Sequence, residues 1–201
     1  MSAALVSIIG PPAVGKTTLA EFLCSVLPAE LIREDYAGNP FIADAYAGQS
    51  AARLPSQLYF LNSRVGQLSL LSWPENGCFV SDYGFCQDRL FATATLTDDD
   101  LAAYEKIARR LSGLVHHPDV VIHLDAVEST LMERIARRGR DFERAVTPEF
   151  LARMRQSYRA AVAELACPII SIDCEKIDLL AEKPRSQLLN SLRRHLTVES
   201  V

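Results

Sequence analysis

Short apolar runs alternate along the chain with segments in which apolar residues recur every three or four positions. The apolar runs predict buried strands at Ala4–Ile9, Glu30–Arg33, Cys78–Ser81, Val120–Leu124 and Ile169–Ile172. The periodic segments predict helices over Thr17–Leu27, Pro55–Leu71, Thr97–Leu111, Ser129–Arg138 and Pro148–Leu165, with a further helical segment from Lys176. Because strands that alternate with helices form βαβ units, the pattern predicts an α/β fold with a five-stranded parallel sheet.

Composition narrows the class of protein. The chain has 201 residues, 49% hydrophobic and 23% charged, which is enough for one sizeable core and predicts a single domain over residues 1–201. A net charge of −4 provides no positive electrostatic field that would attract nucleic acid. Neither a membrane span nor a signal peptide is expected. The five cysteines show no C-x-x-C spacing, which favours reduced thiols in the cytoplasm.

One segment matches the pattern G-x-x-x-x-G-K-[ST] without a mismatch and lies between the first strand and the first helix. Its glycines allow backbone N–H groups to surround a phosphate, and the helix N-terminus adds partial positive charge. The pattern assigns Lys16 to the β- and γ-phosphates and the Thr17 hydroxyl to magnesium. The expected ATP-binding residues here are Gly10, Pro11, Pro12, Ala13, Val14, Gly15, Lys16, Thr17 and Thr18.

A phosphate loop alone does not decide which reaction follows. GTPases usually carry an N-K-x-D segment, which this sequence lacks, whereas a small-molecule kinase needs arginines because the transferring phosphoryl group is stabilised electrostatically. Arginines gather around Gly139, and we expect a lid over about residues 134–146 that binds phosphates. The alternative is a solvated helix end. The arginines concerned are Arg134, Arg137, Arg138 and Arg140.

Three further segments resemble the deoxynucleoside kinase family, in particular its bacterial deoxyadenosine and deoxyguanosine kinases and deoxycytidine kinase. Arg138-Gly139-Arg140 with Glu143 resembles the family's lid motif R-G-R-x-x-E. Asn39-Pro40-Phe41, Tyr46 and the segment from Gln57 to Arg64 resemble its nucleoside-pocket helices. Ser81-Asp82-Tyr83, followed by Asp88-Arg89-Leu90-Phe91-Ala92, resembles the segment after its third strand.

The resemblance covers about residues 5–165 and implies a three-layer P-loop kinase fold. It also implies phosphorylation of a deoxynucleoside at the 5′-hydroxyl, with Mg²⁺ and ATP or another nucleoside triphosphate as donor. A homodimer is implied as well, although the role of the segment from residue 176 to 201 is left open.

Carried over residue by residue, the resemblance implies a catalytic role for Glu34, Lys16 and Arg134. Glu34 would be the base that takes the 5′-hydroxyl proton, with the adjacent Asp35 as the alternative. Asp82 would hold magnesium with Thr17. The remaining implied contacts are a paired hydrogen bond from Gln57 to the base, Tyr46 and Glu143 at the 3′-hydroxyl, and Arg134, Arg138 and Arg140 at the phosphates.

Arg64 and Asp88 resemble a pair that lies near the base edge in members acting on deoxycytidine or deoxypurines, which argues against thymidine. Their alternative role is a buried ion pair that orients helices. One departure concerns the family's E-R-S triplet, which is Asp82-Tyr83-Gly84 here. The arginine that contacts the 5′-hydroxyl is therefore missing, and Arg89 is its candidate replacement.

Other polar residues have plainer interpretations. Asp98, Asp99 and Asp100 form the acidic first turn of a helix, and Asp125 is expected to cap the helix that follows it. Two rival functions stay open from sequence. One is another small-metabolite kinase, of the nucleoside monophosphate or shikimate type, and the other is a nucleotide-binding regulatory subunit without turnover.

Overall fold

A computed structural model describes residues 3–179 and 181–196 and contains one five-stranded parallel sheet. Its strand order is β2-β3-β1-β4-β5. This topology confirms the predicted α/β fold, and each predicted strand is present within one residue at either end. The strands are β1 (Ala4–Ile9), β2 (Ala29–Ile32), β3 (Cys78–Ser81), β4 (Val120–Asp125) and β5 (Ile169–Asp173).

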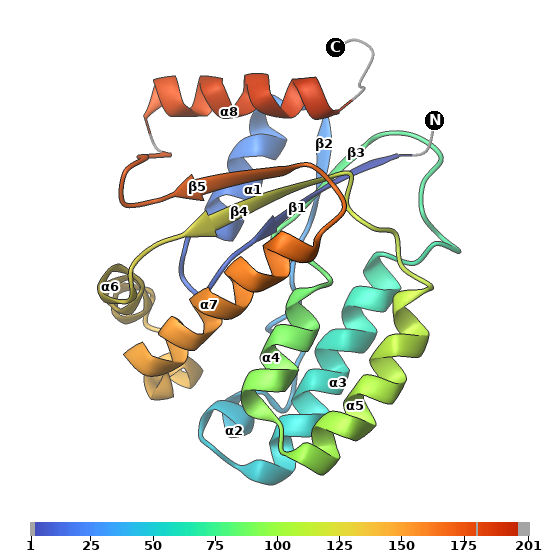
Figure 1. Cartoon of the computed structure of the whole chain (residues 1–201), viewed down its shortest axis with the longest axis vertical. Coiled ribbons are helices and arrows are strands. Elements are labelled where there is room, and N and C mark those ends of the chain that lie inside the picture. The colour runs from blue at the N-terminus through green and yellow to red at the C-terminus, as the bar shows by residue number, and fades with distance from the viewer. Residues whose placement is uncertain (1–2, 180, 197–201) are drawn as a thin grey trace.

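Helices cover both faces of the sheet, as Figure 1 shows. On one face, Val6 and Ile8 of β1 pack in a cluster with α1 (Lys16–Val26) and α8 (Glu182–His195), and α6 (Glu128–Arg138) extends this cluster. On the other face, Leu5 and Ile9 belong to clusters that include residues of three further helices. These are α3 (Ser50–Gln67), α4 (Gln87–Thr95) and α7 (Pro148–Glu164), and α5 (Asp98–Ser112) packs beside α3 and α4.

The helices depart from prediction in places where periodicity is weak. Helix α3 begins five residues earlier than expected, so Pro55 lies inside it, and it ends at Gln67. Leu71 therefore lies in a turn, with 93% of its surface exposed. Three short elements were not predicted because each is too brief for the helical pattern of apolar residues to repeat clearly: α2 (Ile42–Tyr46), α4 and the 3₁₀ helix η1 (Asp141–Ala145).

The segment from residue 176 covers the sheet through α8, which begins at Glu182 rather than at Lys176. Leu188 and Leu192 of α8 are buried against the strands. The prediction for Asp125 was wrong, because its carboxylate accepts hydrogen bonds from Arg155 and Arg159 of α7 instead of capping α6.

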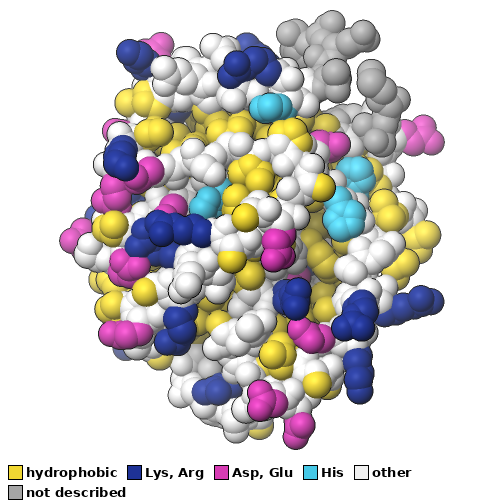
Figure 2. Space-filling model, in the orientation of Figure 1, with side chains coloured by type: hydrophobic (Ala, Val, Ile, Leu, Met, Phe, Trp, Pro, Cys, Tyr) yellow, Lys and Arg dark blue, Asp and Glu magenta, His cyan; other side chains and the backbone are white. Residues whose placement is uncertain are grey.

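Two observations concern the surface and the thiols. No helix within residues 3–179 and 181–196 has the length and apolar content needed to span a bilayer. Acidic and basic side chains are interspersed over the face drawn in Figure 2. All five cysteines are free thiols.

Candidate active site

The phosphate loop joins β1 to α1 at the carboxyl edge of the sheet. Gly10 has a φ of +146°, and a Cβ there would lie 2.3 Å from the Leu124 carbonyl oxygen, so a side chain is excluded. Gly15 is left-handed at the start of α1, where no side chain caps the helix. The first N–H groups of α1 are therefore available to donate to an anionic ligand at the positive end of the helix dipole.

Lys16 follows this turn and lines the cavity beside the loop. Its ammonium donates hydrogen bonds to the carbonyls of Gly10, at 2.8 Å, and Pro11, at 3.1 Å. Burial lowers the pKa of Lys16 to about 8, although the nearby carboxylate of Asp82 acts in the opposite direction. The ammonium is thus poorly solvated, and a bound phosphate would supply the countercharge it lacks.

Asp82 and Thr17 meet at the end of β3. The Thr17 hydroxyl donates to Asp82 Oδ2 at 2.6 Å, and the Glu34 backbone N–H donates to Oδ1 at 2.8 Å. Burial raises the pKa of Asp82, an effect opposed by the Thr17 hydrogen bond and by Lys16. A hydroxyl and a buried carboxylate beside a phosphate loop are the hard oxygen donors that Mg²⁺ prefers, so these residues fit that ion.

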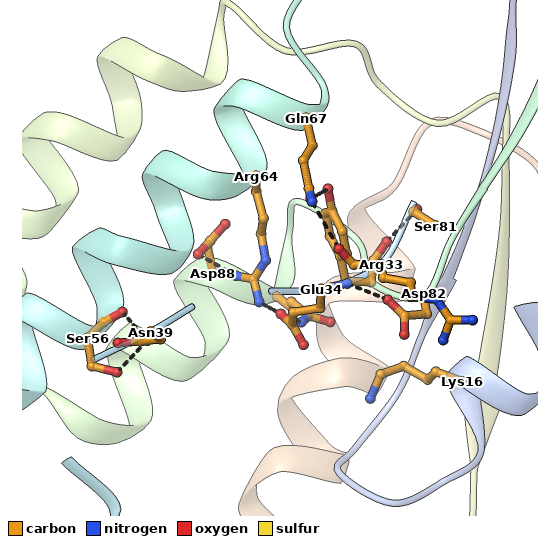
Figure 3. Close-up of polar contacts among 12 residues, drawn as sticks. Lys16, Arg33, Glu34, Asn39, Ser56, Arg64, Gln67, Ser81, Asp82 and Asp88 are labelled. Atoms are coloured by element: carbon orange, nitrogen blue, oxygen red, sulfur yellow. Dashed lines mark hydrogen bonds and ion pairs between the residues drawn. The ribbon is translucent and has the colours of Figure 1, made fainter. Parts of the chain in front are cut away.

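Glu34 is held at the centre of a buried ion network, which Figure 3 shows. The Arg64 guanidinium forms ion pairs with both Glu34 and Asp88, and it lies over the Phe60 ring at 5.2 Å. Burial raises the pKa of Asp88 to about 6, while Arg64 opposes this rise. Gln87 Nε2 also donates to Glu34 Oε1, at 2.7 Å.

The adjacent carboxylate has a different environment. Asp35 accepts a hydrogen bond from the Gly38 N–H at 2.8 Å and another from the Tyr59 hydroxyl, and it does not line the cavity, whereas Glu34 does. The structure therefore favours Glu34 over Asp35 as the carboxylate that faces a ligand.

The candidate replacement for the missing arginine was wrong. The Arg89 side chain is 74% exposed, pairs with Glu105 and lies outside the cavity lining. Tyr83 points away from the cavity, since its hydroxyl donates to Gln67 Oε1 at 2.6 Å and its ring lies beneath Arg64. Arg64 is thus the guanidinium that reaches Glu34.

Most of the predicted nucleoside residues line the same cavity, whereas buried Asp88 does not. Gln57 is buried, and its amide donates to Thr95 Oγ1 at 3.4 Å. Asn39 joins the loop after β2 to α3 by donating to Ser56 Oγ at 3.0 Å, as Figure 3 shows. Tyr46 packs edge-on against Phe142, and burial raises its pKa to about 12. The lining members are Tyr46, Gln57, Arg64 and Glu143.

The lid extends from α6 through η1. Arg134 donates to the Val14 carbonyl at 2.9 Å, which joins α6 to the phosphate loop. Arg138 makes two hydrogen bonds to buried Glu143, and Arg140 lies over the Tyr36 ring at 4.9 Å. The predicted lid residues therefore line the cavity from the phosphate loop to the nucleoside end.

One cavity of about 1010 Å³ joins the phosphate loop, Glu34, the lining nucleoside residues and the lid, whereas Asp82 and Asp88 lie behind its lining. Sequence reasoning missed several lining residues, of which Gln87 directly touches a predicted site residue. It also missed the loop after β5 and Arg185 of α8. Because ligands bind beyond the carboxyl ends of parallel strands, the position of this loop could have been predicted. The missed lining residues include Tyr36, Arg53, Phe60, Gln87, Arg153, Ile177 and Arg185.

The fold and this cavity define a P-loop phosphotransferase. The family model "Deoxynucleoside kinase" matches residues 6–197. The chain therefore belongs to the deoxynucleoside kinase family, as the sequence resemblance predicts, and it is a phosphotransferase that acts on a deoxynucleoside hydroxyl.

Individual relatives agree with this assignment. The chain is 32% identical over 175 residues to the deoxyadenosine kinase of Dictyostelium discoideum, which covers 84% of this chain and 71% of the relative. It is 28% identical over 190 residues to the deoxyguanosine kinase of Bacillus subtilis, which covers 90% and 92%. A solved deoxyadenosine kinase from M. mycoides shares the fold, with a TM-score of 0.81 at 22% identity, covering 94% of this chain and 98% of that one.

Proposed function

We propose that this kinase transfers the γ-phosphoryl group of Mg²⁺-bound ATP to the 5′-hydroxyl of deoxyadenosine, deoxyguanosine or deoxycytidine, in preference to thymidine. The observation that carries this proposal is the position of Glu34. It lines a single cavity between Lys16 and the phosphate loop on one side and Gln57 and Phe60 on the other.

The donor end binds and neutralises the triphosphate. Backbone N–H groups at the start of α1 and the Lys16 ammonium contact the β- and γ-phosphates, and the lid arginines approach from α6 and from the segment between α6 and η1. Thr17 and Asp82 would hold Mg²⁺, which supplies charge neutralisation for the phosphates. The lid arginines with this role are Arg134, Arg138 and Arg140.

The acceptor end orients the nucleoside. Gln57 presents an amide donor and acceptor to the base, while Tyr46 and Glu143 hold the 3′-hydroxyl. Glu34 accepts the 5′-hydroxyl proton as that oxygen forms a bond to the γ-phosphorus and the bond to the β-phosphate oxygen breaks. ADP leaves, and the product is the deoxynucleoside 5′-monophosphate.

Arg64 and Asp88 support the choice of substrate. They form a buried pair close to the nucleoside compartment, as expected for members that take deoxycytidine or deoxypurines. The relatives named above carry the names deoxyadenosine and deoxyguanosine kinase. Arg64 is already paired with two carboxylates, so it offers no free charge to an acceptor phosphate, which argues against a nucleoside monophosphate kinase.

The test is a radiolabelled-ATP assay against four deoxynucleosides, four ribonucleosides and the common monophosphates. Label on deoxyadenosine, deoxyguanosine or deoxycytidine supports the proposal and gives the base preference. Label only on monophosphates would mean that Arg64 binds the phosphate of the acceptor, and it would contradict the proposal. ATP binding without any transfer is the result expected of a regulatory subunit.

We also propose that residues 1–201 form one domain, that the protein is cytoplasmic and that it is a homodimer. Free thiols are compatible with a reducing compartment. The homodimer is carried over from the resemblance to the deoxynucleoside kinase family. Sedimentation analysis tests the dimer, and a monomer at micromolar concentration contradicts it.

A further inference from the structure

Gln87 is the first residue of α4, directly after the turn that follows β3. Only 2% of its surface is exposed. Its backbone N–H donates to the Gly84 carbonyl at 3.0 Å. Gly84 itself packs so closely on β1 that a Cβ there would lie 2.5 Å from Ile9 Cγ2. The turn therefore fixes where the Gln87 side chain starts.

The Gln87 amide connects two buried groups from different elements. Tyr158 of α7 places its hydroxyl 3.2 Å from Gln87 Oε1, and Gln87 Nε2 lies 2.7 Å from Glu34 Oε1. Burial raises the pKa of Tyr158 well above its usual value, so the hydroxyl keeps its proton and donates to Oε1. A carbonyl oxygen turned toward Tyr158 leaves the amide N–H groups turned toward Glu34.

Gln87 and Arg64 contact the same carboxylate oxygen, Glu34 Oε1. We propose that Gln87 is a positioning residue that, together with Arg64, holds Oε1 and so presents Oε2 of Glu34 to the substrate hydroxyl. This inference rests on the proposed role of Glu34 as base. The carboxylate is then held by a cation and by a neutral amide that Tyr158 orients.

Gln87→Met keeps the length of the side chain and removes the hydrogen-bond donor. We expect kcat to fall about 10- to 100-fold, the usual loss for a hydrogen bond to a charged group, with the deoxynucleoside KM unchanged within about threefold. Because the amide touches Glu34, the loss should appear in kcat and leave KM unchanged. A wild-type kcat, or a loss of similar size in KM, overturns the inference.

Tyr158→Phe provides a second variant that leaves Gln87 in place. We expect a smaller fall in kcat, again with KM unchanged, because the amide is no longer oriented. Tyr104→Phe is the matched control, since its buried hydroxyl has no hydrogen-bond partner among the described residues and lies on α5. If Tyr158→Phe and Tyr104→Phe behave alike, the orienting role of Tyr158 is wrong.

A double variant separates this inference from the proposed function. If Gln87 acts through Glu34, adding Gln87→Met to Glu34→Gln should reduce kcat by less than about twofold further. A further loss equal to that of the single variant means that Gln87 acts elsewhere, which overturns the inference and leaves the base intact. Full turnover in Glu34→Gln alone contradicts the base assignment instead.

Discussion

Two carboxylates adjacent in the sequence, Glu34 and Asp35, have separate tasks in the structure. Glu34 faces the cavity, where an arginine and an amide hold it. Hydrogen bonds from Tyr59 and from the Gly38 N–H lower the pKa of Asp35, which stabilises the turn after β2. Sequence could not separate them, because the direction of each side chain depends on backbone angles that this turn sets.

Glu34→Gln should leave deoxynucleoside binding nearly intact and reduce kcat by about 10²- to 10⁴-fold, because the base is lost while the shape is kept. Steady-state kinetics with titration calorimetry of the nucleoside measures both effects. Asp35→Asn is the matched control and should retain kcat within about twofold. Comparable losses of kcat in the two variants would contradict the assignment of Glu34, rather than Asp35, as the base.

The lowered pKa of Lys16 leads to a second prediction for a single residue. Because that pKa is about 8, the free enzyme loses the ammonium proton as the pH rises through 8, whereas a bound phosphate needs the ammonium. The Kd for a non-hydrolysable ATP analogue should therefore rise by up to about tenfold per pH unit above 8. Titration calorimetry between pH 7 and 9.5 measures this change.

Lys16→Met provides the reference for that titration. It should bind the analogue weakly at every pH, without the inflection near 8, and its turnover should be strongly reduced. A wild-type affinity that stays constant from pH 7 to 9.5 would mean that Lys16 keeps its proton without the ligand.

At the scale of elements, Arg155 of α7 connects the end of β4 to the start of α6. It donates to Asp125 Oδ1 at 2.8 Å and to Glu128 Oε1 at 2.6 Å. Burial acts to raise the pKa of Asp125, but hydrogen bonds from Arg155 and Arg159 outweigh it and hold the pKa below its usual value. Since α6 carries the lid arginines Arg134 and Arg138, this network fixes where the lid begins.

Arg155→Met should lower the free energy of unfolding by about 2 kcal/mol, because it leaves the Asp125 carboxylate poorly compensated. The KM for ATP should rise several-fold as α6 loses its anchor. Urea denaturation and steady-state kinetics measure these effects. The double variant with Asp125→Asn should lose less free energy of unfolding than the two single variants lose in sum. Strictly additive losses would show that Arg155 and Asp125 are not coupled.

The depressed pKa of Asp125 gives this network a pH signature. The pair contributes stability above the unfolded carboxyl pKa of about 3.9, and that contribution is lost as the pH falls through the lower folded value. In Asp125→Asn, the free energy of unfolding, measured by urea denaturation at several pH values, should therefore fall less steeply as the pH is lowered.

Local sequence determines some of these elements and leaves others undetermined. The phosphate loop was predictable because eight adjacent residues carry both its shape and its chemistry. Helix α4 was not, since its nine residues show too little periodicity, and Gln87 at its start was missed with it. The contact between Gln87 and Glu34 joins residues 53 positions apart, so only the fold, which brings the start of α4 to the loop after β2, reveals it.

At the scale of the whole molecule, the cavity and the core depend on the same helices. Helix α8 lines the donor end of the cavity through Arg185, and it packs into the core through Leu192, which is fully buried. The single tryptophan, Trp73, packs in the cluster of Leu5 and Tyr83 on the other face of the sheet, and its indole N–H donates to the Ala3 carbonyl at 3.1 Å. Fluorescence of Trp73 therefore reports on a cluster to which α8 contributes no residue.

Leu192→Ala should lower the free energy of unfolding by about 2–5 kcal/mol, the usual cost of deleting a buried leucine side chain. If residues 1–201 form one domain, the transition followed by Trp73 fluorescence should shift together with that followed by circular dichroism. Leu71→Ala is the control, because Leu71 is 93% exposed and its loss should change stability by less than about 0.5 kcal/mol. A fluorescence midpoint that stays at the wild-type value while the dichroism midpoint falls would show that α8 unfolds independently, and the proposal of one cooperative domain would then be wrong.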